Sequence, residues 1–176
     1  VQEGARLARE NRVDLILAVG GGSAMDCCKA VSLAARYEGD IWEDFWAQPG
    51  VVDFEPLPLG VIVTVAGTGN ECNGGAVITH EEKKVKTGRD YPACNPRFAL
   101  MDPTYTYSVP MRQMVSGGFD ILSHIMETYF SEPNEDNVSD GIMEALMKSV
   151  IRNLRASMQN PEDYTARMDP YAFRRL

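Results

Sequence analysis

A run of three glycines between an apolar segment and a helical pattern limits the folds open to this chain more than any other feature. Residues 15–19 (Leu-Ile-Leu-Ala-Val) lead directly into residues 20–23 (Gly-Gly-Gly-Ser). The short apolar run predicts a strand buried on both faces of a parallel sheet. A helical pattern follows over residues 24–36, and Ser23 with Asp26 resembles a capping box at its start. The order of strand, glycine turn and helix indicates an α/β fold.

The glycine turn also has the features of an anion site. Unpaired N–H groups and the helix dipole favour negative charge at a helix N-terminus, and glycine lets a phosphate approach the backbone. Gly21, Gly22 and Ser23 therefore indicate a cradle for a pyrophosphate. The segment is neither Gly-x-Gly-x-x-Gly nor a P-loop, so taken alone it fits equally well a tight strand-to-helix turn or a flexible loop.

A second glycine turn follows the next apolar run. Residues 59–65 predict a buried strand, and Gly67-Thr68-Gly69 comes directly after it. Hydroxyl groups at Thr64 and Thr68 could bond to a nucleotide there, and two glycine turns at successive strand ends predict a single ligand crevice. Each threonine taken separately could instead satisfy local backbone groups.

Lysine is scarce, and three of the five lysines fall between positions 83 and 86. This cluster follows the strand expected at residues 76–79. It could be the solvated tip of a hairpin, or it could help to hold a phosphate or the ribose of a cofactor. We take Lys86 as a candidate cofactor ligand and Lys83 as a surface residue.

The pattern of the chain changes near its middle. Another strand is expected at residues 98–101, whereas apolar residues recur at helical spacing after Pro110. We therefore predict two regions: a dinucleotide-binding α/β region with a parallel, Rossmann-like sheet over residues 1–105, and the start of an all-helical region over residues 106–176.

Composition narrows the range of partners. With 17 Lys and Arg against 25 Asp and Glu, the formal net charge is −8, and this disfavours nucleic acid and anionic membranes, because both are bound through cationic side chains. No window approaches the ~18 consecutive apolar residues of a membrane span. The four cysteines form neither a zinc nor a disulfide pattern. We therefore expect a cytoplasmic protein with no membrane or nucleic-acid partner.

A candidate metal site lies in the helical region. Asp120 and His124 are four residues apart, so their side chains face the same side of a helix and could bind one divalent ion. Glu127 shares this face, and the Gly117-Gly118 pair allows a neighbouring segment to approach closely. The alternative is a simple Asp–His hydrogen bond, since the sequence offers no other histidine in a suitable place to complete a metal site.

These motifs together resemble the iron-containing, or group III, alcohol dehydrogenases, and within them the butanol-dehydrogenase-like branch. The resemblance covers essentially the whole chain and rests on the order and spacing of short motifs. These are residues 13–23 with Asp26 and Lys29, Trp42, the T-x-x-G-T-G-x-E pattern of residues 64–71, and residues 76–79, 101–103 and 118–127. Asn70 departs from the serine that is usual in the second motif.

The resemblance implies a dehydroquinate-synthase-like fold that binds NAD or NADP. The expected cofactor-binding residues are Gly21, Gly22, Ser23, Asp26, Thr64, Thr68 and Lys86. Asp120 and His124 are expected to be the first two ligands of Fe²⁺ or Zn²⁺, and Glu127 a residue of the motif that is not a ligand. The implied reaction is hydride transfer between a nicotinamide cofactor and a small primary alcohol or aldehyde, assisted by the metal.

Family members are longer at both ends, where they carry an adenosine-side pocket and two further histidine ligands. We therefore expect an internal fragment or a truncated product, inactive by itself, of a protein that is a homodimer when complete. Polyol oxidation of the glycerol-dehydrogenase type and an inactive nucleotide-binding remnant remain alternatives. A lyase of the dehydroquinate-synthase type is disfavoured, because residues 113–130 contain no Lys or Arg to bind its polyanionic substrate.

Overall fold

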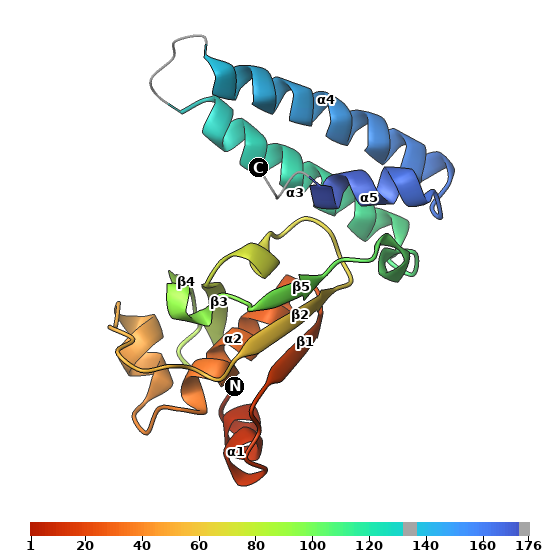
Figure 1. Cartoon of the computed structure of the whole chain (residues 1–176). Coiled ribbons are helices and arrows are strands. Elements are labelled where there is room, and N and C mark those ends of the chain that lie inside the picture. Colours follow the sequence, from red (N-terminus) through yellow and green to blue (C-terminus); the bar gives the residue numbers. More distant parts are fainter. Residues whose placement is uncertain (132–136, 173–176) are drawn as a thin grey trace. The chain divides into compact units, whose positions relative to one another are not determined.

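The computed structural model describes residues 1–131 and 137–172, with side chains described as far as residue 168. The chain forms two compact units. The α/β unit consists of residues 1–63 and 69–100, and the helical unit consists of residues 64–68 and the chain from residue 101 onward. Figure 1 shows the strands in the first unit and the long helices in the second.

The α/β unit is built around a small parallel sheet. Its strand order is β1-β2-β5, and Ile16 of β1 pairs with Leu59 of β2, while Gly60 of β2 pairs with Phe98 of β5. The elements of this unit are α1 (Gln2–Glu10), β1 (Ile16–Gly20), α2 (Gly22–Ala34), the π-helical turn η1 (Trp42–Ala47), β2 (Leu59–Val63), η2 (Asn70–Cys72), β3 (Gly75–His80), β4 (Val85–Asp90), η3 (Pro92–Cys94) and β5 (Phe98–Leu100). The expected order of strand, glycine turn and helix is confirmed.

One face of this sheet is covered and the other is open. Helix α2 packs against β1 and β2, and on that side Ala18 and Val61 are almost completely buried. On the opposite side Leu17 and Val19 of β1 are 47% and 58% exposed, and Leu100 of β5 is 53% exposed. The prediction that β1 is buried on both faces is therefore wrong for the described residues, because no described element of this unit covers the second face.

The strand expected at residues 76–79 forms, but it does not join the parallel sheet. It is β3, which pairs antiparallel with β4 in a separate two-stranded sheet, with Thr79 opposite Lys86. The sequence analysis missed β4, because its residues are mostly polar and exposed and show no apolar alternation. A hairpin of this kind is recognised by its pairing rather than by burial.

Aromatic residues form the main core of the α/β unit next to this hairpin. Trp46 is 2% exposed, and its indole N–H donates to the carbonyl of Ala76 on β3 at 3.1 Å. Tyr91 donates its hydroxyl hydrogen to the carbonyl of Phe45 and lies edge-on to that ring. The segment after residue 39 is thus a buried aromatic turn that joins α2 to the hairpin.

The helical unit confirms the predicted change of pattern. It contains η4 (Pro103–Thr106), α3 (Met111–Tyr129), α4 (Val138–Gln159) and α5 (Tyr164–Ala172), with no strand among its described residues. Helices α3 and α4 lie side by side, and a Cβ atom added at Gly118 would come within 2.8 Å of the Leu154 side chain. No helix in the described ranges is long and apolar enough to cross a membrane.

Candidate functional site

The first glycine turn leaves the sheet at Gly20 and starts α2 two residues later. Gly20 has φ +155°, and a Cβ atom there would lie 2.7 Å from the Cβ atom of Ala24, so both the backbone and the packing require glycine. The N-cap is Gly21, and α2 begins at Gly22. The predicted capping box is wrong, because Ser23 lies inside the first turn of the helix rather than before it.

The N-terminus of α2 lacks a side-chain cap. The amides of Ala24 and Met25 donate to the carbonyl of Gly21 at 3.1 and 3.2 Å, and no side chain caps the helix start. The first N–H groups of a helix have no intrahelical acceptor, and together with the helix dipole they favour an anion. This arrangement is compatible with a phosphate group at Gly21, Gly22 and Ser23, and their role as a pyrophosphate cradle stays a prediction.

Asn70 connects this turn to the segment that follows the second glycine turn. Its side-chain N–H₂ donates to the carbonyl of Gly22 at 3.1 Å and also to the carboxylate of Asp26. Asp26 lies near the start of α2, so this hydrogen bond joins the beginning of the helix to Asn70. A serine side chain is shorter and has a single hydrogen to donate, so the asparagine found at this place supplies contacts that the usual serine would not.

Lys29 is a functional candidate that the sequence analysis quoted but did not interpret. It is 1% exposed, and its Nζ atom donates to the carbonyls of Asn70 at 2.7 Å and Gly75 at 2.9 Å, to the side-chain oxygen of Asn73 at 3.2 Å and to that of Asn70. Burial lowers the pKa of Lys29 to about 8, although the nearby Asp26 carboxylate acts in the opposite direction. The feature of the sequence that could have revealed this role is a lysine in the middle of an otherwise apolar helix face.

The second glycine turn follows β2, whose last residue, Val63, pairs with Gly20 at the end of β1. Gly67 and Gly69 have φ +138° and +68°, so both positions require glycine. Thr64 is half-buried and Thr68 is exposed. The hydroxyls of Thr64 and Thr68 make no side-chain hydrogen bond within the described residues, and their role as nucleotide contacts stays a prediction.

This second turn also packs against the helix that carries the predicted metal ligands. A Cβ atom at Gly117 of α3 would lie 2.8 Å from the carbonyl oxygen of Ala66, and one at Gly67 would lie 3.4 Å from the backbone of Gly117 and 3.7 Å from an Asp120 carboxylate oxygen. The expected close approach of a neighbouring segment at Gly117 is therefore found. It places the second glycine turn next to Asp120.

The lysine cluster lies on the hairpin. Lys86 is exposed on β4, and its side chain makes no hydrogen bond or ion pair with any described residue. Lys83 forms an exposed ion pair with Glu43 of η1, as a surface residue would. The assignment of Lys86 to the cofactor therefore rests on the resemblance alone.

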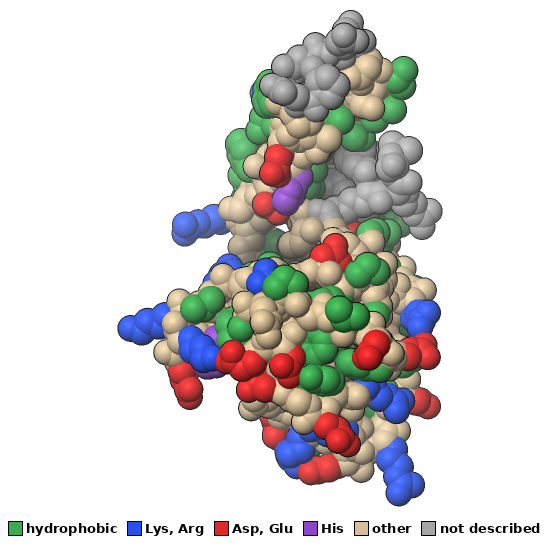
Figure 2. All heavy atoms as spheres, turned by 90° about the vertical axis from the view of Figure 1, so that its left-hand side faces the viewer, with side chains coloured by type: hydrophobic (Ala, Val, Ile, Leu, Met, Phe, Trp, Pro, Cys, Tyr) green, Lys and Arg blue, Asp and Glu red, His purple; other side chains and the backbone are tan. Residues whose placement is uncertain are grey.

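Asp120 and His124 lie on one face of α3, as their spacing predicts. His124 Nε2 is 3.8 Å from Asp120 Oδ1, and the two side chains are 60% and 50% exposed. Figure 2 shows a histidine beside acidic side chains on the surface of the helical unit. A carboxylate and an imidazole suit Fe²⁺ or Zn²⁺, so the pair fits part of a metal site, but no group of three or more possible ligands exists within the described ranges.

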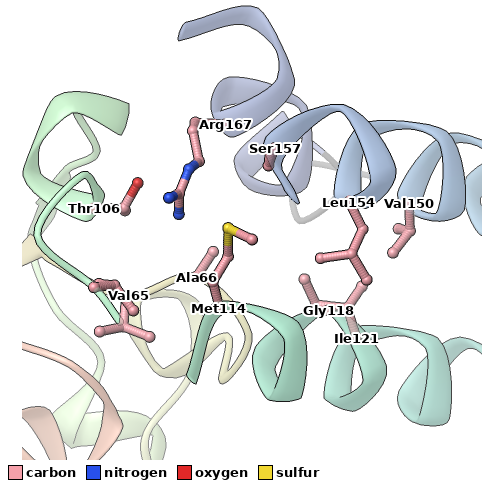
Figure 3. Close-up of a pocket in the computed structure, with 11 residues that line it drawn as sticks. Val65, Ala66, Thr106, Met114, Gly118, Ile121, Val150, Leu154, Ser157 and Arg167 are labelled. Atoms are coloured by element: carbon pink, nitrogen blue, oxygen red, sulfur yellow. The ribbon is translucent and has the colours of Figure 1, made fainter. Parts of the chain in front are cut away.

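A different face of α3 borders a small cavity of about 50 Å³ inside the helical unit. Its wall is mainly apolar: Met114, Gly118 and Ile121 of α3 face Val150 and Leu154 of α4 (Figure 3). Thr106 and Arg167 extend into one end, where the guanidinium also donates to the carbonyl of Pro161 at 2.9 Å. Because the cavity and the Asp120–His124 pair lie on different faces of α3, this space is part of the helical core.

Comparison with known proteins agrees with this arrangement. Residues 1–103 match the family described as iron-containing alcohol dehydrogenase, and residues 114–172 match the C-terminal part of the Fe-containing alcohol dehydrogenase family. The chain is 41% identical over 167 residues to the NADH-dependent butanol dehydrogenase A of Clostridium acetobutylicum, covering 95% of this chain and 42% of the relative. It is 34% identical over 165 residues to the NADPH-dependent aldehyde reductase of Escherichia coli, covering 92% and 42%.

A solved structure shows the same fold. The crystal structure of the NADH-dependent butanol dehydrogenase A of Thermotoga maritima matches with a TM-score of 0.87 at 36% identity, covering 96% of this chain and 42% of that one. The chain thus spans less than half the length of the curated relatives that it matches.

Proposed function

The chain belongs to the iron-containing alcohol dehydrogenase family, and from this premise we propose that the complete protein transfers a hydride between NAD or NADP and a small primary alcohol or aldehyde. The observation that carries the proposal is the start of α2 at Gly21 and Gly22, which has no side-chain cap and whose Gly22 carbonyl accepts a hydrogen bond from Asn70. The named relatives include NADH-dependent and NADPH-dependent proteins, so either cofactor is compatible with the proposal.

In this proposal the α/β unit binds the dinucleotide. The amides at Gly21, Gly22 and Ser23 receive the pyrophosphate, and Asp26 contributes through its hydrogen bond from Asn70. Thr64 and Thr68 contact the nucleotide from the second glycine turn, and Lys86 binds on the cofactor side. These roles come from the resemblance together with the geometry of the first turn.

The helical unit supplies part of the metal site. Asp120 and His124 would hold Fe²⁺ or Zn²⁺ from one face of α3. When bound, such an ion polarises the oxygen of the alcohol or aldehyde. The chain's own contribution is to place the two donors and to hold the second glycine turn beside Asp120.

The experiment is a kinetic comparison in a protein of the relatives' full length that contains this sequence. Gly21→Val places a branched side chain where phosphate and backbone must approach each other. We expect the KM for the cofactor to rise at least tenfold while the KM for the alcohol stays nearly constant, because phosphate and backbone can no longer approach closely. An equal rise in both constants would contradict the proposed pyrophosphate site.

A second function concerns the 176-residue chain itself. Since only two possible ligands meet on α3 within the described ranges, we propose that this chain alone binds a nucleotide without catalysing the reaction. The finer assignments stay predictions: a butanol-type alcohol or a glycerol-type polyol as substrate, a homodimer for the complete protein, and a cytoplasmic location. Assay of several alcohols and polyols with the full-length protein would separate the two substrate classes.

A further inference from the structure

A buried ammonium group lies behind the first glycine turn, where an apolar side chain would be the ordinary choice. The hydrogen bonds of Lys29 Nζ within the described part of the chain go to neutral oxygens of residues 70–75, while the carboxylates of Asp26, Asp90 and Glu71 act on its charge. Burying a charge without an opposite charge in contact is costly. The hydrogen bonds that offset this cost therefore fix the backbone of residues 70–75 against α2.

These hydrogen bonds also determine which way the Asn70 amide faces. The side-chain oxygen of Asn70 accepts from Lys29, so its N–H₂ group must point away from the lysine. On that side it donates to the carbonyl of Gly22 and to the carboxylate of Asp26. Rotating the Asn70 amide would place its N–H₂ group against the ammonium and its oxygen against the Asp26 carboxylate, and both contacts are unfavourable.

The chain of contacts therefore runs from Lys29 through Asn70 to the first residue of α2. We propose that Lys29 and Asn70 are positioning residues that hold the turn of residues 20–23 in the form that receives a dinucleotide pyrophosphate. For the identity of its ligand this inference rests on the proposed function. Neither side chain touches the ligand, because Lys29 is buried and the Asn70 amide is occupied by protein acceptors.

Two variants of the 176-residue chain remove different parts of this network. Lys29→Met removes the ammonium and retains an unbranched apolar side chain. Asn70→Asp keeps an acceptor for Lys29 but removes the hydrogen that is donated to Gly22. Lys148→Met is the matched control, because Lys148 is exposed on α4 and, among the residues that the structure describes, pairs with Glu144 alone.

The reporters are the amides of Ala24 and Met25, which close the turn by donating to the carbonyl of Gly21. We expect hydrogen exchange of these two amides, measured without ligand, to be about tenfold faster in Lys29→Met and Asn70→Asp, the effect of one lost hydrogen bond. Amides in the middle of α4 should exchange as in the unsubstituted chain. If Lys29→Met fails to fold, Asn70→Asp decides the question, because it retains the partner of the lysine.

A merely structural role gives a different result. In that case hydrogen exchange at Ala24 and Met25 would change only in proportion to the global stability, which the melting temperature measures. Asn70→Asp would not accelerate exchange, because it replaces a neutral contact with Lys29 by an ion pair. Exchange in both variants no faster than in Lys148→Met would overturn the inference.

Titration with NADH separates this inference from the proposed function. We expect NADH to bind the unsubstituted chain and Lys148→Met equally, and to bind Lys29→Met about tenfold more weakly. An unsubstituted chain that binds no NADH would refute the nucleotide binding proposed for this chain alone, while the exchange measurement would still decide whether Lys29 and Asn70 hold the turn. Unchanged NADH affinity in Lys29→Met would overturn the positioning role.

Discussion

The glycine turn of the α/β unit and the Asp120–His124 pair of the helical unit are supported in different ways. Behind the turn, Lys29 and Asn70 are at least 95% buried and bonded to one another. The two proposed metal donors, in contrast, are at least half exposed and 3.8 Å apart. An anion site at a helix N-terminus uses backbone groups from one short segment, whereas a metal site needs donors from several segments. The anion site can be fixed within this chain, whereas the described residues supply two of the three or more protein ligands that a catalytic metal site normally has.

The largest expected effect tests this difference directly. We expect the 176-residue chain to retain much less than one equivalent of Fe²⁺ or Zn²⁺ after dialysis, because a catalytic site normally has at least three protein ligands. Elemental analysis measures the metal content. His124→Ala should leave that low content unchanged in this chain and abolish metal binding in a full-length protein. One tightly held ion per 176-residue chain, unaffected by His124→Ala, would refute the assignment of the two ligands.

A smaller effect is expected where the second glycine turn meets α3. Gly117→Ala places a Cβ atom 2.8 Å from the carbonyl oxygen of Ala66, a backbone atom that cannot move without shifting the turn. We expect the free energy of unfolding of the helical unit to fall by about 1–3 kcal/mol, as for other overpacked sites. Urea unfolding followed by circular dichroism measures it.

Gly141→Ala is the matched control for this substitution. Gly141 also lies in a helix, but a Cβ atom there meets no other atom within 4 Å. Alanine should stabilise that helix by about 0.5–1 kcal/mol. Equal stabilisation by both substitutions would show that Gly117 is not needed for the contact with the second turn.

The smallest expected effect is a pH dependence specific to Lys29. Burial lowers its pKa to about 8 from 10.5, so above pH 7 the unfolded chain binds more protons at this residue than the folded chain does. Stability contributed by this group therefore rises with pH, by about 1 kcal/mol between pH 7 and 8.5. Asp26, Glu71, Asp90 and Cys94 also act on Lys29.

The measurement compares urea unfolding of the unsubstituted chain and Lys29→Met over that pH range. The difference between the two curves removes most of the contribution of other groups, including Cys94, whose pKa burial raises to about 11. A parallel pair of curves would mean that Lys29 keeps an ordinary pKa in the folded chain. The hydrogen bonds of Lys29 would then contribute less to stability than the burial of this residue indicates.

Much of the fold followed from the sequence, because local patterns determined it. The apolar runs at residues 16–20 and 59–63 became neighbouring strands, and the stripes after Pro110 became helices. The hairpin strand at residues 85–90 was missed since its polar residues form a pair through backbone hydrogen bonds rather than through burial. The open face of β1 was also missed, because an apolar run indicates preference for burial but not which partner provides it.

The site was predictable to the same limited extent. The spacing of Asp120 and His124 defined one face of a helix, and the glycines indicated the turn. The roles of Lys29 and Asn70 could not be predicted, because their contact joins positions 41 residues apart in the chain. Contacts of this kind depend on how the segments pack, and no short motif contains them.

The cavity beside α3 makes the helical unit sensitive to hydrostatic pressure. Its volume of about 50 Å³ per molecule corresponds to about 30 mL per mole, which is comparable with the volume changes that accompany protein unfolding. Compression favours the state in which water fills such a space. Pressure can therefore favour unfolding of the helical unit through this cavity, without acting on a charge or a ligand.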